Sequence, residues 1–327
     1  MTKNKANQIL KKFSDVRVLI IGDLIMDHFI WGNVNRISPE APVPVVDVTS
    51  ENLLLGGSAN VANNINSLGG RSIVSGIVGR DNDGQALIDM LKKMKIRTRS
   101  IVVDDVRPTT IKTRVIAHNQ QVVRFDREAK FKINGSVLKK VVADIKKSIS
   151  SVDAVIISDY AKGLISKDLV EEIVIQAKRY GIPIAVDPKV SHFDFYKDVN
   201  IVTPNNFEAS MASGIDICDE DSLSVAGDLL SAKLGCEALL VTRGEHGMNL
   251  FEDKASTHIP TVAKEVYDVS GAGDTVIAVI GLALGSGATY KEAAVLANFA
   301  AGIVVGKVGT ASVSIDELKD AVKKGLG

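Results

Sequence analysis

The eight residues from Asp268 to Thr275 place small residues and a carboxylate directly before an apolar run. That run, 276–280, predicts a buried helix. Its first backbone N–H groups are unpaired, and its positive dipole end faces the Gly271-Ala272-Gly273 turn. Such a turn can hold a phosphoryl group, and Asp274 beside it can take a proton from an attacking hydroxyl. The segment therefore indicates phosphoryl transfer to an alcohol, although a tight turn capped by Asp274 would show the same residues.

A second pair of glycines precedes another predicted helix and suits a sugar. Gly56 and Gly57 let the backbone approach a ligand closely, and Asn60 offers a donor and an acceptor on the first helical turn. Asp27 follows the first predicted strand, at the edge where open α/β sheets bind ligands. A carboxylate and an amide together match sugar hydroxyls, which both donate and accept. The alternative is that Asn60 and Asp27 only cap helices or turns.

Two further segments follow predicted strands and suit Mg²⁺ and a nucleotide. Asn205 and Glu208 are three residues apart, so a helical turn puts them on one face. An amide and a carboxylate there can order the waters that Mg²⁺ keeps, or they can simply begin a helix after Pro204. The turn from Thr242 to Gly247 contains two glycines that can border a phosphate or ribose, and an ordinary turn explains it equally well.

The composition argues against several classes of protein. The chain has 327 residues, 24% charged and 46% hydrophobic, which is typical of a globular fold. Lys plus Arg and Asp plus Glu both number 39, so no net basic field attracts nucleic acid or membrane. Cys218 and Cys236 lack metal-binding spacing and fit a reducing compartment. Residues 1–15 have no apolar core like that of a signal peptide, so we expect a cytoplasmic protein without a nucleic-acid or membrane partner.

Predicted strands and helices alternate through most of the chain. This pattern predicts an α/β fold with a mainly parallel central sheet and helices on both faces. No flexible linker or internal repeat divides the chain, so residues 1–327 are expected to form one domain. The expected strands are 16–21, 72–78, 152–157, 184–186, 201–202 and 238–241, and the expected helices are 58–68, 83–94 and 167–180.

Two stretches break this alternation. Residues 29–50 and 101–131 alternate apolar and polar side chains, which is the period of a half-buried strand. We expect both to form antiparallel strands outside the main sheet. Together they would make a small β lobe inserted into the α/β body.

These motifs, in this order, resemble the ribokinase (PfkB) family of sugar kinases over essentially the whole chain. The stretch from Gly56 to Gly84 resembles the family's N-terminal signature, Asp268 to Asp274 its C-terminal signature, and Asn205 to Glu208 its NxxE motif. The resemblance implies a ribokinase-like fold with a β lid, the use of ATP and Mg²⁺, and a homodimer paired through the lid.

Four shorter segments narrow the resemblance to family members that phosphorylate D-glycero-β-D-manno-heptose 7-phosphate at C1, a step toward ADP-heptose and lipopolysaccharide core. These segments are 37–44, 158–163, 187–189 and 304–310. The expected small-molecule partners are therefore a sugar phosphate and ATP.

The resemblance also implies a role for each candidate residue. Asp274 would be the catalytic base, and the amides of Gly271, Ala272 and Gly273 would form the anion hole. The sugar would be held by Asp27, Gly56, Gly57, Asn60 and Asp159. ATP would be bordered by Asn205, Glu208, Thr242, Gly244, Gly247 and Asn298, with Asn205 and Glu208 organising Mg²⁺ through water. A monovalent cation such as K⁺, which many relatives bind, would have Asp268, Ser270, Gly309 and Ser312 as candidates.

The phosphate of a sugar phosphate needs cations away from ATP, and Arg can grip phosphate through two hydrogen bonds. The candidates are Arg36, Lys112, Arg114, Arg124 and Lys189. Each would equally suit a solvated surface. Lys112 and Lys189 are preferred because both lie in segments with other polar landmarks.

Three alternatives stay open at this point. One is another kinase of the same family, acting on ribose, fructose, fructose phosphate or a nucleoside. Another is a nucleotide-sensing protein without turnover, against which an intact Asp274 speaks. A dehydrogenase would share the fold class, but the chain lacks the GxGxxG pattern.

Overall fold

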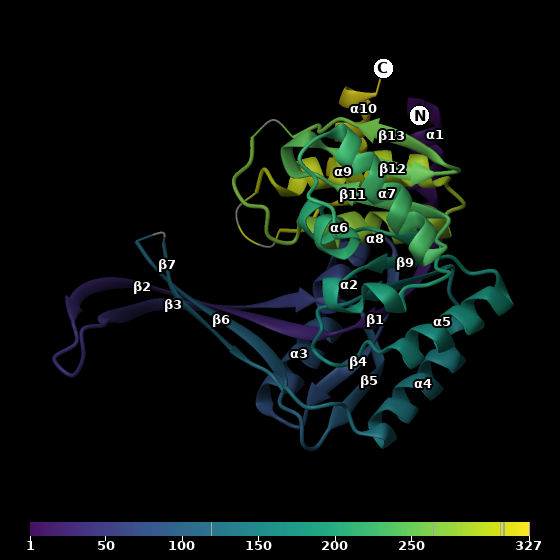
Figure 1. Ribbon diagram of the computed structural model, residues 1–327. Coiled ribbons are helices and arrows are strands. Elements are labelled where there is room, and N and C mark those ends of the chain that lie inside the picture. The colour runs from purple at the N-terminus through teal and green to yellow at the C-terminus, as the bar shows by residue number, and fades with distance from the viewer. Residues whose placement is uncertain (119, 264, 308, 310, 327) are drawn as a thin grey trace.

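Figure 1 shows the computed structural model as an α/β body from which a long β lobe projects. The structure describes residues 1–118, 120–263, 265–307, 309 and 311–326. No helix within these ranges combines the length and the apolar character needed to cross a membrane.

A nine-stranded sheet runs through the body in the order β13-β12-β11-β10-β9-β8-β1-β4-β5. Its strands from β11 to β5 pair in parallel, and β12 and β13 add an antiparallel edge. The strands are β1 (Arg17–Gly22), β4 (Arg71–Gly79), β5 (Arg97–Asp104), β8 (Ala154–Ser158), β9 (Ile184–Asp187), β10 (Ile201–Val202), β11 (Ala238–Thr242), β12 (Met248–Glu252) and β13 (Ala255–Ile259).

Helices cover both faces of this sheet because its central strands are apolar on both sides. In β1, Val18 and Ile20 belong to one apolar core, and Leu19 and Ile21 to the other, as alternating strand residues must. The first core receives α1 (Lys3–Lys12), α2 (Ser58–Ser67), α3 (Asn82–Lys93), α8 (Ala272–Gly285), α9 (Tyr290–Val304) and α10 (Ile315–Gly325). The second receives α4 (Gly135–Ile149), α5 (Lys167–Tyr180), α6 (Asn206–Ser213) and α7 (Glu220–Leu234). Short 3₁₀ helices are η1 (Phe13–Asp15), η2 (Val190–Phe195) and η3 (Gly244–His246). The predicted α/β fold class is confirmed.

The lobe is a separate four-stranded sheet in the order β3-β2-β6-β7. Its strands are β2 (Leu24–Ile37), β3 (Pro44–Gly57), β6 (Thr110–Ala117) and β7 (Gln120–Arg127). The expectation that all of its strands are antiparallel was wrong, because β2 and β6 pair in parallel. Residues 101–104 were also misplaced, since they belong to β5 in the main sheet. Alternation predicts a strand but carries no information about which strand it will pair with.

Candidate active site

Asp274 lies on the first turn of α8 and is only 6% exposed. Its Oδ1 accepts a hydrogen bond from the hydroxyl of Tyr160 (2.5 Å), and its Oδ2 accepts one from Nδ2 of Asn60 (2.7 Å). Burial raises the pKa of Asp274 to about 6, although these two hydrogen bonds favour the carboxylate and oppose the rise. At neutral pH the group is therefore mainly ionised and can accept a proton.

The turn before α8 is open toward a ligand. Gly271 has φ of +79°, a left-handed conformation that favours glycine. No side chain among the described residues caps the N-terminus of α8, so this end keeps its attraction for an anion. The N–H of Ala272 donates to the carbonyl of Val269 (3.2 Å) and is engaged in the turn itself. A Cβ added at Gly273 would meet no described atom within 4 Å, which leaves room for a bound group.

The predicted sugar residues at the base of the lobe gather beside Asp274. Asp27 on β2 is 7% exposed, and its Oδ1 accepts from Nη1 of Arg114 on the neighbouring strand β6 (2.5 Å). A Cβ on Gly56 would lie 2.2 Å from Oδ2 of Asp27, so only glycine leaves space for this carboxylate. Asn60, another predicted sugar residue, hydrogen-bonds directly to the carboxylate of Asp274.

Four cations lie close together at the base of the lobe, and we call Lys112, Arg114, Arg124 and Lys162 the basic cluster. Burial lowers the pKa of Lys112, and the charges of the other three cations lower it further, whereas the carboxylate of Asp27 raises it. All three cations are therefore near enough to Lys112 to affect its charge. The Lys112 ammonium lies 5.1 Å from the centre of the Tyr160 ring. Arg124 is paired with Asp126 (2.6 Å), and Lys162 with Glu128. Such a cluster of cations suits a phosphate.

Three predicted substrate residues lie elsewhere. Arg36 is exposed at the far end of β2, roughly 30 Å from Asp27 along the strand. Lys189 lies near Asp187 and Glu208. Burial raises the pKa of both carboxyl groups, and the charge of Lys189 partly offsets this rise. Asp159, which was expected to hold the sugar, contacts His192 and Tyr196.

The carboxylate of Asp159 is enclosed by the chain itself. Its Oδ2 contacts Nδ1 of His192 (2.7 Å) and accepts from the hydroxyl of Tyr196 (2.6 Å), and its Oδ1 accepts from the N–H of Ala161 (2.7 Å). Its side chain has no exposed surface. Asp159 therefore supports the loop that follows β8.

Asp187, at the end of β9, is an acidic residue to which the sequence reasoning gave no role. Burial, followed by the charges of Asp274 and Glu208, raises the pKa of Asp187 well above its usual range. The signal was available, because Asp187 follows a predicted strand within a segment that carried the family resemblance. Acidic side chains crowded in this way gain from a nearby cation.

Asn205 and Glu208 begin α6 as a capping box. Oδ1 of Asn205 accepts from the N–H of Glu208 (2.8 Å), and Oε2 of Glu208 accepts from the N–H of Asn205 (3.0 Å). No group of three or more His, Cys, Asp or Glu in the described ranges could hold a metal by direct ligation. Asp187 and Glu208 fit Mg²⁺ held through water and phosphate oxygens, because that ion keeps much of its hydration.

A pocket of about 710 Å³ lies beside the α8 turn. It brings together residues from three stretches of the sequence, 242–248, 261–276 and 298–305, and among them are the predicted Thr242, Gly244, Gly247, Ala272, Gly273 and Asn298. Nδ2 of Asn298 donates to the carbonyl of Pro260 (2.7 Å), which fixes the far wall. A volume of this size accommodates a nucleotide.

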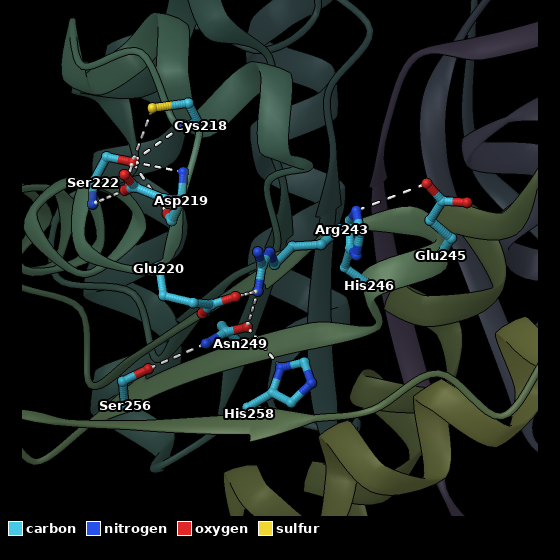
Figure 2. A network of polar contacts seen from close by, with 10 residues as sticks. All are labelled: Cys218, Asp219, Glu220, Ser222, Arg243, Glu245, His246, Asn249, Ser256 and His258. Carbon is cyan, nitrogen blue, oxygen red and sulfur yellow. Dashed lines mark hydrogen bonds and ion pairs between the residues drawn. The ribbon is translucent and has the colours of Figure 1, made fainter.

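Arg243 anchors the turn that forms one wall of this pocket (Figure 2). Its Nη1 donates to Glu220 on α7 (2.7 Å) and to Oδ1 of Asn249 on β12 (3.0 Å). His258 contacts the same oxygen of Asn249 (3.1 Å). Hydrogen bonds thus connect the turn from 243 to 247 to α7 and to β12.

Three of the four predicted monovalent-cation residues lie together. Asp268 accepts from the N–H of Ser270 (2.8 Å) and from the N–H of Gly309 (3.1 Å). The carbonyl of Ser312 instead accepts from the ammonium of Lys307 (2.9 Å). Within the segment 304–310, residues 308 and 310 lie outside the described residues.

The sequence reasoning also gave no role to Asp23 and Tyr160. Asp23 is 5% exposed and accepts from the N–H groups of Tyr160 (3.0 Å), Lys162 (3.0 Å) and Leu164 (3.3 Å). Asp23 thereby holds the loop after β8 in place and keeps Tyr160 next to Asp274. Asp23 directly follows the first strand, and this position was the available signal.

The sequence matches the pfkB family carbohydrate kinases over residues 16–317, and the chain belongs to this family. It is therefore a carbohydrate kinase, a phosphotransferase, and kinases of this family use ATP and Mg²⁺.

Among curated relatives, the chain is similar to the bifunctional protein HldE of Syntrophotalea carbinolica, with 42% identity over 323 residues, covering 98% of this chain and 66% of the relative. It is also similar to the bifunctional protein HldE of Sulfurimonas denitrificans, with 44% identity over 313 residues, covering 96% of this chain and 65% of the relative. The chain thus spans just under two thirds of the length of these relatives.

Solved structures share the fold. Phosphofructokinase-2 from Escherichia coli, in complex with substrates and products, superposes with a TM-score of 0.79 at 18% identity, covering 94% of this chain and 99% of that one. The ribokinase of Arabidopsis thaliana, complexed with ribose and ATP, gives 0.72 at 19% identity, covering 94% and 98%.

Proposed function

We propose that this chain transfers the γ-phosphoryl group of ATP to the C1 hydroxyl of D-glycero-β-D-manno-heptose 7-phosphate. The observation that carries the proposal is that Asp274 lies on the helical turn that lines the nucleotide-sized pocket and within electrostatic reach of Lys112 in the basic cluster. The heptose is favoured by the segments 37–44, 158–163 and 187–189 and by the likeness to the bifunctional proteins HldE. The product, heptose 1,7-bisphosphate, would feed the synthesis of ADP-heptose and lipopolysaccharide core.

In the proposed mechanism the acceptor hydroxyl attacks the γ-phosphorus in line. Asp274 takes the hydroxyl proton as the new P–O bond forms and the bond to the ADP oxygen breaks. Backbone amides at the N-terminus of α8 stabilise charge on the transferred group. Mg²⁺, held near Asp187 and Glu208, would neutralise charge on the ATP phosphates. No covalent enzyme intermediate is required.

The 7-phosphate would bind the basic cluster, with Lys112 nearest to the base. The charge of Lys112 lowers the pKa of Asp274, so the two groups are within electrostatic reach. Asp27 would accept from a sugar hydroxyl while Arg114 holds the Asp27 carboxylate in place. Closure of the lobe over the sugar would exclude water, which competes as acceptor.

The lobe would also pair two copies of this chain. Its strands and their connecting turn expose apolar side chains that a second lobe could cover: Ile37, Val43, Val48, Leu53, Leu54, Val122, Val123 and Phe125. Exposed apolar patches of this kind mark interaction surfaces. Light scattering should give a dimer mass, and a monomer across the micromolar range would refute this part of the proposal.

A monovalent cation such as K⁺ would bind near Asp268, Ser270 and Gly309, beside the anion hole. The lowered pKa of Asp268, to which the N–H groups of Ser270 and Gly309 contribute, keeps its carboxylate charged. Exchange of K⁺ for a large organic cation should lower turnover if this holds.

The proposal is tested by measuring ADP release across a panel of sugars, with the product position assigned by phosphorus NMR. Turnover is expected to be fastest with heptose 7-phosphate and to give a C1 phosphate. Preference for ribose, fructose, fructose phosphate or a nucleoside would favour another kinase of the family. ATP binding without turnover on any acceptor would favour the nucleotide-sensing alternative.

A further inference from the structure

Tyr160 contacts the catalytic base directly and still has no function assigned to it. Its hydroxyl lies 2.5 Å from Oδ1 of Asp274, while Asn60 holds Oδ2 from the other side. The two oxygens of the base are thus each held by one donor. Each oxygen keeps a further lone pair for the acceptor hydroxyl.

The direction of the hydrogen bond from Tyr160 is fixed by its surroundings. Burial, followed by the charge of Asp274, raises the pKa of Tyr160 well above 10. The phenol therefore stays protonated at any pH at which the enzyme works. It can only donate to the carboxylate, and donation favours the ionised form of Asp274.

Tyr160 is held firmly in this position. Asp23 binds the backbone N–H groups of Tyr160 and Lys162, each at 3.0 Å. Asp159, the preceding residue, is locked by His192 and Tyr196. The Lys112 ammonium lies over the phenol ring at 5.1 Å. These contacts fix the backbone around Tyr160 and pack against its ring.

The other groups that face Asp274 act in both directions. Burial in the apolar first turn of α8 and the carboxylates of Asp27 and Asp187 favour the protonated form, and the ammonium of Lys112 favours the ionised one. The two neutral donors, Tyr160 and Asn60, oppose the burial. A buried base needs such donors, because a protonated Asp274 cannot accept the hydroxyl proton.

We propose that Tyr160 is a positioning residue for phosphoryl transfer, and that its phenol both aims the carboxylate of Asp274 and keeps it charged. The inference rests on the proposed role of Asp274 as the base, and it does not depend on which sugar is the acceptor. It deepens the proposed function by naming the group that makes a buried carboxylate usable near neutral pH.

The experiment compares Tyr160→Phe with the unaltered protein over a range of pH, using any sugar that the unaltered protein phosphorylates. Loss of the donor should move the acid limb of kcat/KM upward by about one pH unit and lower the plateau of kcat. The KM for ATP should stay the same. Tyr290→Phe is the matched control, because it removes a phenol that donates to another carboxylate, that of Glu237, and should leave the acid limb in place.

A second readout needs no turnover. The carboxyl carbon of Asp274, labelled with ¹³C and assigned by its loss in Asp274→Asn, is titrated in the ligand-free protein. Its midpoint should rise by about one pH unit in Tyr160→Phe and stay unchanged in Tyr290→Phe. An unmoved midpoint in Tyr160→Phe would overturn the inference. If the unaltered protein phosphorylated no sugar, the proposed function would fail, while this titration would still decide the role of Tyr160.

Discussion

Gly56→Ala is expected to damage sugar binding while leaving the fold intact. The added Cβ would lie 2.2 Å from Oδ2 of Asp27 and 3.0 Å from its Cγ. Nonbonded carbon and oxygen atoms need about 3 Å or more, so the carboxylate must move by roughly 0.8 Å. The atom displaced is the end of a side chain and not backbone, so the strand can keep its path. The Asp27–Arg114 contact of 2.5 Å cannot keep its geometry.

The size of the effect follows from this displacement. A shift of about 1 Å in a group that orients a substrate can cost about 100-fold in rate. We therefore expect kcat/KM for the sugar to fall about 100-fold, with the KM for ATP unchanged, because neither Gly56 nor Asp27 lines the nucleotide pocket. Coupled-enzyme assays that vary each substrate in turn separate the two constants, and a thermal melt reports the fold.

Gly135→Ala is the matched control. A Cβ added at Gly135, in the first turn of α4, would meet no described atom within 4 Å. Alanine should slightly stabilise the helix there and leave both kinetic constants unchanged. The reasoning is refuted if Gly56→Ala keeps its sugar kcat/KM within about twofold, since Asp27 would then not orient the acceptor.

The remaining predictions concern the base, the basic cluster and the nucleotide turn. Asp274→Asn should lower kcat by about 10²- to 10⁴-fold, while the affinity for ATP, measured by calorimetry, should stay the same. Unaltered turnover would show that Asp274 is not the base. Because Asp274 must be ionised and burial raises its pKa to about 6, activity of the unaltered protein should fall as pH drops through that value, and a flat rate down to about pH 4 would contradict it. Lys112→Gln should raise the KM for the sugar phosphate about tenfold without affecting ATP, whereas Arg36→Gln, far out on β2, should change neither. Arg243→Ala should weaken ATP binding about tenfold, because it removes the hydrogen bond that holds the turn to Glu220. Glu245→Ala is the control in the same turn, since the Glu245 side chain is 86% exposed, and it should leave ATP binding unchanged. Equal effects of the two changes would argue against a role of Arg243 in holding the turn.

The sequence by itself determined much of the local structure and singled out the candidate segments for chemistry. Strand and helix alternation predicted the α/β class, because hydrophobic periodicity reflects which face each element buries. The turn from Gly271 to Asp274 and the pair Gly56 and Gly57 were recognisable as candidate sites, because the proposed chemistry needs glycine, small residues and a carboxylate within a few positions of one another. The turn from Thr242 to Gly247, which lines the pocket, was singled out for the same reason.

The tertiary structure decided which distant residues meet. Tyr160 and Asn60 lie 114 and 214 positions from Asp274 and still hold its two oxygens. Asp159, one residue before Tyr160, turns inward to His192. Residues 101–104 join the main sheet although their alternation matches that of the lobe. Such contacts depend on strand order and on buried residues such as Asp23, which hydrogen-bonds to a distant loop. No local window of sequence contains this information, because the periodicity of a segment shows which of its faces is buried and not which element packs against that face.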